Sequence, residues 1–296
     1  METKTAFKAF DKNLKCRGFQ YEIGKEYKHE GKVEVCESGF HSCENPLDVL
    51  NYYDLTESRF AEVECSGDIK THLDDSKIAS KKIKIKAELK LGEFIKASID
   101  YLFKSGNKDE RTQAASGDSA QLAASGVYAK LAASGDYAKL AASGVYAKLA
   151  ASGDSAKLAA SGDSAQLAAS GDSAQLAASG VYAQLAASGV YAKLAASGDS
   201  AKLAASGVYA QLAASGVYAQ LAASGDYAKL DIQGTASVGS AIGYNSIIKG
   251  INGTLICLVE YDKDYKPIGF VTGKIGENGL KENTFYKAIN GKFEEA

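Results

Sequence analysis

A nine-residue repeat fills the middle of this 296-residue chain. From Ala114 to Leu230 the sequence consists of 13 tandem copies of A-A-S-G-[DV]-[SY]-A-[KQ]-L, and two decayed copies keep the glycine phase through Gly234 and Gly243. A fixed short period is typical of arrays in which each repeat adds one unit to a stack. The period therefore constrains the fold more strongly than the preferences of the single residues do.

The repeat length excludes a continuous helix and a continuous strand. Nine residues at about 100° each turn an α-helix through about 900°, so successive leucines would face opposite sides. In one extended strand an odd period likewise sends Leu122, Leu131 and Leu140 to alternate faces. We therefore predict one turn per repeat, with a strand over [SY]-A-[KQ]-L-A-A and a corner at S-G-[DV], where glycine supplies a positive φ.

Stacked corners predict a parallel β-solenoid in a mainly β protein. Each Leu and two alanines of a repeat point inward, whereas Tyr or Ser and Lys or Gln point outward. Because the inward side chains are small, we favour two repeats per coil, which gives about seven coils and roughly 35 Å at about 4.8 Å per coil. Three repeats per coil is the alternative, and it gives a shorter, wider rod.

The array resembles two known kinds of repeat. Its length and glycine placement are similar to the calcium-binding nonapeptides of secreted bacterial toxins, but it lacks their double glycine and second aspartate. The segment 237–246 resembles the left-handed β-rolls of trimeric adhesin heads, which supports the fold only. Aspartate follows glycine in seven copies and valine in the other six, so we expect no calcium site. The seven are Asp118, Asp136, Asp154, Asp163, Asp172, Asp199 and Asp226.

The outward rows hold the candidate binding residues. Tyrosine rows either stabilise neighbouring coils by stacking or form a recognition surface for a partner. Seven Asp against seven Lys make the array electrically neutral, which argues against a nucleic-acid partner. The candidates are Tyr128, Tyr137, Tyr146, Tyr182, Tyr191, Tyr209, Tyr218 and Tyr227, together with Lys130, Lys139, Lys148 and Lys193.

Two smaller regions flank the array. We predict an α+β N-terminal domain at 1–113 that caps the solenoid, the solenoid at 114–251, and a β-rich C-terminal cap at 252–296. Asn45 caps a short helix that begins at Pro46 and runs to about Tyr53. A helix at 91–104 places Phe94, Ile95, Ile99, Leu102 and Phe103 on one face. Strands are expected at 5–10, 20–27, 32–36 (after a hairpin turn at 29–32), 59–65, 82–90, 254–261 and 267–274, and a last hairpin at 284–293.

Three features of the N-terminal domain are candidates for chemistry. Cys36, His41 and Cys43 are weak candidate metal ligands, but their spacing matches no common zinc site, so we expect ordinary thiols, no metal and no cofactor. His41 next to one of these cysteines is also a candidate nucleophile pair, although no catalytic residue is assigned. The third feature is a lysine run, which we expect to pair with Glu62 and Glu64 across a sheet. Its members are Lys81, Lys82, Lys84, Lys86 and Lys90.

The first hundred residues resemble an uncharacterised domain of bacteriophage and prophage proteins that is often followed by Ala-Ser-Gly repeats. The resemblance rests on Lys8-Ala-Phe-Asp, Cys16-Arg-Gly-Phe-Gln-Tyr, Gly24-Lys-Glu-Tyr, residues 37–48 and Arg59-Phe-Ala-Glu-Val. The Gly39-Phe-His turn, followed by a short helix that ends in Tyr52-Tyr53, more faintly resembles ADP-ribosyltransferase-like folds, without a complete catalytic set. Cys257, within LICLV, is expected to be a core residue.

These observations favour a binding function. The chain has a net charge of -2, five cysteines and no run of about 18 apolar residues, and it begins without the apolar core of a signal peptide, so we expect a cytoplasmic protein with reduced thiols. Our first hypothesis is a non-enzymatic phage or prophage scaffold that presents the solenoid to a host macromolecule, which it could inhibit. The expected partner is a protein, and the sequence is also compatible with a homo-oligomer of this chain. The alternatives are a virion tail-fibre or adhesin component and an N-terminal enzyme with the array as its spacer.

Overall fold

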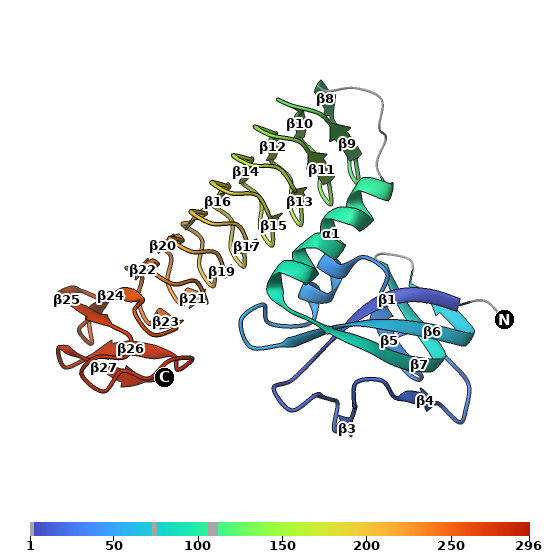
Figure 1. The fold of residues 1–296 in the computed structure, drawn as a ribbon, viewed down its shortest axis with the longest axis horizontal. Helices are drawn as coiled ribbons and strands as arrows, with labels where there is room; N and C mark the ends of the chain where they lie inside the picture. Colours follow the sequence, from blue (N-terminus) through green and yellow to red (C-terminus); the bar gives the residue numbers. More distant parts are fainter. Residues whose placement is uncertain (1–2, 73–75, 106–111) are drawn as a thin grey trace. The chain divides into compact units, whose positions relative to one another are not determined.

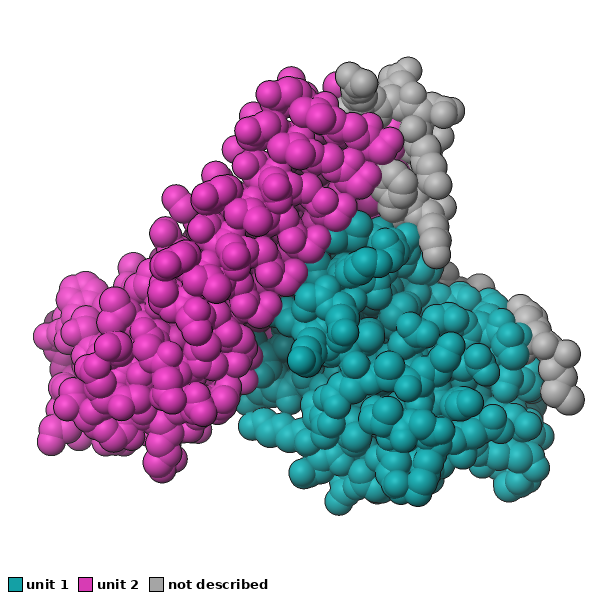
Figure 2. Space-filling view, viewed as in Figure 1, with its two compact units in different colours: residues 1–101 teal, residues 102–296 magenta. Residues whose placement is uncertain are grey.

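The computed structural model describes residues 3–72, 76–105 and 112–296 (Figure 1). The chain divides into two units, Met1–Tyr101 and Leu102–Ala296 (Figure 2). The protein is mainly β, as predicted, with an antiparallel sheet in the first unit and a β-solenoid in the second. No helix in the described ranges is long and apolar enough to cross a membrane.

The first unit is built on an antiparallel sheet with the described strand order β4-β7-β5-β1-β6. Since β6 also pairs with β7, strands β7, β5, β1 and β6 form a closed ring. The strands are β1 (Thr3–Phe10), β4 (Glu26–Lys28), β5 (Phe40–Cys43), β6 (Arg59–Thr71) and β7 (Lys77–Leu89), and β2 (Lys15–Cys16) and β3 (Phe19–Gln20) form a separate hairpin.

The short helix and the long strands of this unit confirm several predictions. A 3-10 helix, η1, spans Pro46–Asn51, and its cap Asn45 accepts a hydrogen bond from the N–H of Leu47 at 3.1 Å. The ammonium of Lys86 lies 3.6 Å from Glu62 and 4.0 Å from Glu64, which confirms the expected pairing for this member of the lysine run. Lys82 lies 3.6 Å from Glu26 of β4 instead.

Two predicted strands of this unit are wrong. Residues 20–27 do not form one strand, because Gly24 (φ +87°) turns the chain before β4. Residues 32–36 form no strand either, since Cys36 has a φ of +69° and only an isolated bridge joins Glu34 to Ser38. The turn expected at 29–32 therefore closes no hairpin, and β4 pairs with β7 instead.

Helix α1 spans Leu91–Ser105, close to the prediction. Its Phe94 packs on Phe60 of β6 with ring centroids 4.4 Å apart, and Ile95, Ile99 and Leu102 are buried. The side chain of Phe103 lies outside the described residues. Capping of the solenoid by the N-terminal domain stays a prediction.

The solenoid has two repeats per coil, as predicted, because each repeat strand pairs in parallel with the strand 18 residues later. It has about eight coils rather than the expected seven, because residues 112–115 and 255–258 add parallel strands at the two ends of the array. Within 112–296 there are two ten-stranded sheets. We name them even-numbered and odd-numbered after their solenoid strands; the hairpin strands β25 and β26 are the two exceptions to this numbering. The even-numbered sheet contains β8 (Thr112–Ala115), β10 (Lys130–Ala133), β12 (Lys148–Ala151), β14 (Gln166–Ala169), β16 (Gln184–Ala187), β18 (Lys202–Ala205), β20 (Gln220–Ala223), β22 (Val238–Ala241), β24 (Leu255–Tyr261) and β25 (Pro267–Lys274). The odd-numbered sheet contains β9 (Gln121–Ser125), β11 (Lys139–Ser143), β13 (Lys157–Ala160), β15 (Gln175–Ala178), β17 (Lys193–Ala196), β19 (Gln211–Ala214), β21 (Lys229–Ile232), β23 (Ile247–Gly250), β26 (Tyr286–Ile289) and β27 (Lys292–Glu295).

The solenoid core is a stack of leucines and alanines. From the second repeat onward the Leu, the second Ala of the pair and the Ala before Lys or Gln are buried, as Leu131, Ala133 and Ala129 show. This confirms the predicted inward set. Register between coils is kept because each Leu lies beside the Leu one coil away.

The repeat glycines do not have the predicted role. From Gly135 onward they do not adopt positive φ; the left-handed residue of each corner is the Ser or Tyr two positions later, such as Ser155 (φ 56°) and Tyr182 (φ 60°). Glycine is needed for close stacking instead. A Cβ on Gly171 would lie 2.2 Å from the carbonyl oxygen of Gly153 in the preceding coil. The corner therefore excludes any larger residue at this position.

The C-terminal residues close the solenoid with two antiparallel hairpins. Strand β25 pairs with β24, and β26 pairs with both β23 and β27. These strands agree with the predicted cap. The expectation for Cys257 is wrong: Ile256 and Leu258 on either side are buried, so alternation along β24 leaves Cys257 on the outer face, half-buried.

Candidate functional site

The candidate tyrosines divide between the two corners of the coil. One corner row leads into the even-numbered strands and the other leads into the odd-numbered strands, so no single face collects all eight. Lys130 and Lys148 begin even-numbered strands, whereas Lys139 and Lys193 begin odd-numbered strands. The first row holds Tyr128, Tyr146, Tyr182 and Tyr218, and the second holds Tyr137, Tyr191, Tyr209 and Tyr227.

Stacking between coils accounts for part of the tyrosine rows. The rings of Tyr191, Tyr209 and Tyr227 form a continuous stack with centroids 5.2 and 5.0 Å apart. Tyr128 and Tyr146 form a second stack at 5.1 Å. These contacts support the structural interpretation of the rows.

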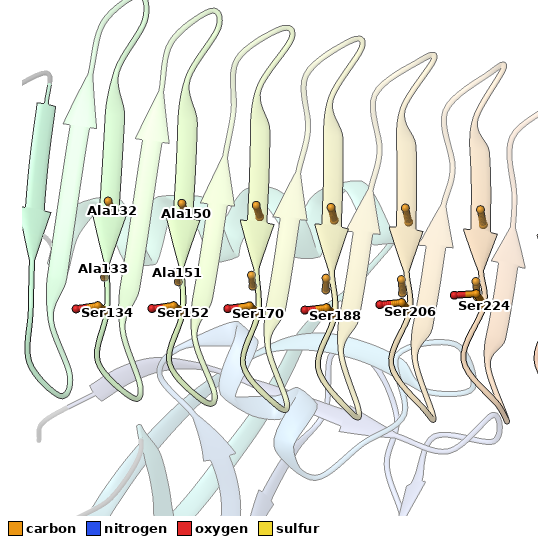
Figure 3. A pocket seen from close by; sticks show the side chains of 18 of the residues that line it. Ala132, Ala133, Ser134, Ala150, Ala151, Ser152, Ser170, Ser188, Ser206 and Ser224 are labelled. Atoms are coloured by element: carbon orange, nitrogen blue, oxygen red, sulfur yellow. The ribbon is translucent and has the colours of Figure 1, made fainter.

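The outer surface of the even-numbered sheet is a regular groove. Three exposed side chains recur in every coil: Lys or Gln, the first Ala of the pair, and Ser. Figure 3 shows the Ala and Ser positions repeating from Ala132 and Ser134 to Ser224. Two adjoining depressions of about 1020 and 910 Å³ run along these rows. We call this surface the even-sheet face; its rows are Lys130, Lys148, Gln166, Gln184, Lys202, Gln220; Ala132, Ala150, Ala168, Ala186, Ala204, Ala222; and Ser134, Ser152, Ser170, Ser188, Ser206, Ser224.

A second candidate site lies within the N-terminal unit. A cavity of about 890 Å³ is bordered by β1, the β2–β3 hairpin, β5 and the residues after η1. Lys8 of β1 lines it and is only 5% exposed. Its ammonium nitrogen donates to the carbonyl of His41 at 2.8 Å and to the Sγ of Cys16 at 3.5 Å. Burial lowers the pKa of Lys8, a shift that Cys16 partly opposes.

Cys16 joins Lys8 to a tyrosine. Its Sγ lies 2.9 Å from the hydroxyl of Tyr53, so the three polar groups form a chain of hydrogen bonds along the cavity. Burial, followed by the contact with Cys16, raises the pKa of Tyr53 above its ordinary value. The tyrosine is therefore a hydroxyl that can donate to the thiol.

His41 is held in the neutral form. Burial, then the positive charges of Lys8, Lys77 and Arg17, lowers the pKa of His41 to about 4. Its Nε2 accepts a hydrogen bond from the backbone N–H of Cys36 at 2.9 Å. His41 thus contacts the backbone of Cys36, and the Cys36 thiol accepts from Lys77 at 3.2 Å instead.

The weak metal candidates do not form a ligand set. Cys36 is exposed and Cys43 is buried in β5. Among the described residues no group of three His, Cys, Asp or Glu side chains is arranged to hold a metal ion. All five cysteines lie in the described ranges, and none of them is part of a disulfide.

Sequence reasoning missed Lys8, Cys16 and Tyr53. One signal was present: Lys8 is the single charge in the apolar run Ala6-Phe-Lys-Ala-Phe10. A lysine in such a run is buried when the strand is covered on both sides, and β1 is buried from Ala6 to Phe10. Its contacts with residues 16, 41 and 53 depend on the tertiary structure.

The fold and the two sites define a β-solenoid protein with a separate N-terminal sheet domain. Residues 4–97 match a protein-family model described as Domain of unknown function (DUF7666). The chain thus carries a DUF7666 domain followed by a β-solenoid region. No curated protein and no solved structure matches the chain.

Proposed function

We propose that the protein is a non-enzymatic binding scaffold of phage or prophage origin, which acts in the cytoplasm of the host and presents its even-sheet face to a host protein. The continuous groove along this face is the observation that carries the proposal. Strongly regular surfaces of this length suit a large partner because the same contact can recur in each coil. Binding would inhibit the partner if the even-sheet face covers the partner's functional surface.

The side chains of the even-sheet face indicate the chemistry of the partner. The exposed Ala row lets another backbone approach closely, and the Ser row offers hydroxyl donors and acceptors on one side of it. Lys130, Lys148 and Lys202 are the charged members of the three rows, which contain no acidic residue. A flat protein surface that carries carboxylates opposite these lysines complements the face.

Paired substitutions test this proposal. Ala168→Arg with Ala186→Arg places two long side chains in the middle of the face, so capture of the partner from host extract should fall at least tenfold. Tyr182→Ser with Tyr218→Ser changes two exposed corner residues to the alternative that other repeats carry, and this control should keep the partner. Circular dichroism checks that both variants fold.

The opposite pattern would contradict the proposal. If the tyrosine variant loses the captured protein and the alanine variant keeps it, the corner rows are the binding surface. If neither variant changes capture, and the protein is trimeric and present in purified particles, it is a virion component.

A further inference from the structure

We propose that Lys8 is a nucleophilic amine that forms an imine with a small carbonyl compound, an aldehyde or a 2-oxo acid, bound in the cavity of the N-terminal domain. The proposal goes beyond the scaffold function and does not depend on it. It rests on the burial of Lys8, on its neighbours and on the space beside it.

The surroundings of Lys8 make its unprotonated amine easier to reach than that of an exposed lysine. Of the described residues, none places a carboxylate within ion-pair distance of its Nζ, whose hydrogen-bond partners are the His41 carbonyl and the Cys16 sulfur. The Nζ also lies 5.6 Å from the ring centroids of Phe10 and Tyr21. An ammonium buried without an anion is costly, and the lowered pKa of Lys8 follows from that burial. Only the unprotonated amine is a nucleophile.

The neighbouring polar groups suit the proton transfers of imine formation. The amine attacks the carbonyl carbon to give a carbinolamine, and a proton delivered to its hydroxyl lets water leave as the C=N bond forms. Overall, Lys-NH₂ and R₂C=O give R₂C=N-Lys and H₂O, so no oxidant or reductant is required. Cys16, 3.5 Å from Nζ, and Tyr53, 2.9 Å from Cys16, form a chain that can pass this proton.

The cavity has room for such a compound and charge for an acid group. Its volume of about 890 Å³ exceeds what a molecule of a few heavy atoms needs. Arg17 and Lys77 line it and raise the positive potential at His41, where a carboxylate of a 2-oxo acid would be stabilised. Four acidic residues also line the cavity: Asp11, Glu37, Asp54 and Glu57. The carboxylates of Asp11 and Asp54 each accept a hydrogen bond from a backbone N–H of their own loop.

Backbone strain lies at the same place. Leu14, Arg17 and Cys36 are non-glycine residues with φ of 58°, 50° and 69°, and they lie in or beside the segments that border the cavity. Left-handed conformations of such residues persist where the surrounding structure holds them, and they cluster at functional sites.

Reductive trapping on the full-length protein tests the proposal. The protein is incubated with pyruvate or with propanal as two separate probes, reduced with sodium borohydride, and mapped by peptide mass spectrometry. We expect Lys8 to be labelled at least tenfold faster than Lys12 and Lys28, two exposed lysines of the same unit that lie outside the cavity. Faster labelling by pyruvate indicates a 2-oxo acid, and faster labelling by propanal indicates a neutral aldehyde. Labelling of Lys8 no faster than Lys12 and Lys28 with both probes would overturn the proposal.

Variants separate a positioning role from a structural one. Cys16→Ala should slow labelling of Lys8 about tenfold. Cys16→Ser places a hydroxyl where the thiol was, so it should recover part of the rate. Cys257→Ala, in the other unit, is the matched control and should leave the rate unchanged. If Cys16→Ala folds and Lys8 reacts at the original rate, the proton chain is wrong.

Discussion

The backbone N–H of Asp172 donates to the carboxylate of Asp154, one coil earlier, at 2.9 Å. The same bond recurs from Val190 to Asp172 at 2.8 Å. Because only the N–H of the later residue is used, that position accepts either Asp or Val. The aspartates of the array therefore hold successive corners together.

Removing one such acceptor should lower the stability of the array. Asp154→Ala leaves the N–H of Asp172 without its side-chain partner at an exposed corner, and we expect a loss of about 0.5–1.5 kcal/mol in the free energy of unfolding. Asp154→Asn keeps an oxygen at the same position and should lose less. Urea unfolding followed by circular dichroism measures both, and equal losses would mean that the carboxylate charge, rather than the acceptor, matters.

Substitution of a repeat glycine should be far more disruptive than substitution of an open one. Gly171→Ala brings a Cβ to 2.2 Å from the Gly153 oxygen, and the forced separation of two coils should cost about 1–3 kcal/mol. Gly269→Ala is the control, since a Cβ there meets no atom within 4 Å. Thermal unfolding compares the two. Similar melting temperatures would refute the close-stacking role of the repeat glycine.

Stacked and isolated corner tyrosines should differ. Tyr209→Ser removes a ring that stacks on both Tyr191 and Tyr227, so we expect a loss of about 0.5–1.5 kcal/mol per stacked pair. Tyr182→Ser is matched to it, because Ser164 and Ser200 occupy the same row one coil away on either side. Chemical unfolding of both variants gives the difference. No excess loss in Tyr209→Ser would show that stacking does not stabilise the array.

Deletions should respect the two-repeat coil. Removal of residues 150–167 takes out one coil and leaves every later residue on its original sheet, so the shortened protein should fold. Removal of 150–158 alone also leaves a foldable array, but it moves every later strand to the opposite sheet. Partner capture should survive the first deletion better than the second. Equal capture by both would contradict the assignment of binding to the even-sheet face.

Acid should destabilise the N-terminal unit through His41. Burial and neighbouring cations lower the pKa of His41 to about 4, from an ordinary value of 6.5. Between these values the unfolded chain binds more protons than the folded chain, so stability falls as pH falls from about 6.5 to about 4. His41→Gln removes this titration and should flatten that part of the pH profile. Urea midpoints between pH 7 and 4 provide the check, and an unchanged slope would contradict it.

The nine-residue period and the fixed positions of Gly, Leu and Ala within it were enough to predict the solenoid from the sequence alone. An odd period with glycine, Leu and Ala in fixed places allows one turn per repeat and one inward set, and Leu131, Ala133 and Ala129 follow it. Strongly alternating or well-capped segments such as 59–65 and Asn45-Pro46 were also predictable, because their signals are local.

The tertiary structure decided what depends on neighbours distant in sequence. The glycines had to be small because of the carbonyl one coil away, as Gly171 and Gly153 show, and not because of their own φ. The strand expected over 20–27 is interrupted by the turn at Gly24 (φ +87°), and β4, which follows the turn, pairs with β7 rather than with residues 32–36. Lys8, Cys16 and Tyr53 come from β1, from β2 and from the residues after η1, so their contacts arise only when these elements pack together. A cavity between packed elements leaves no periodic signal in the chain.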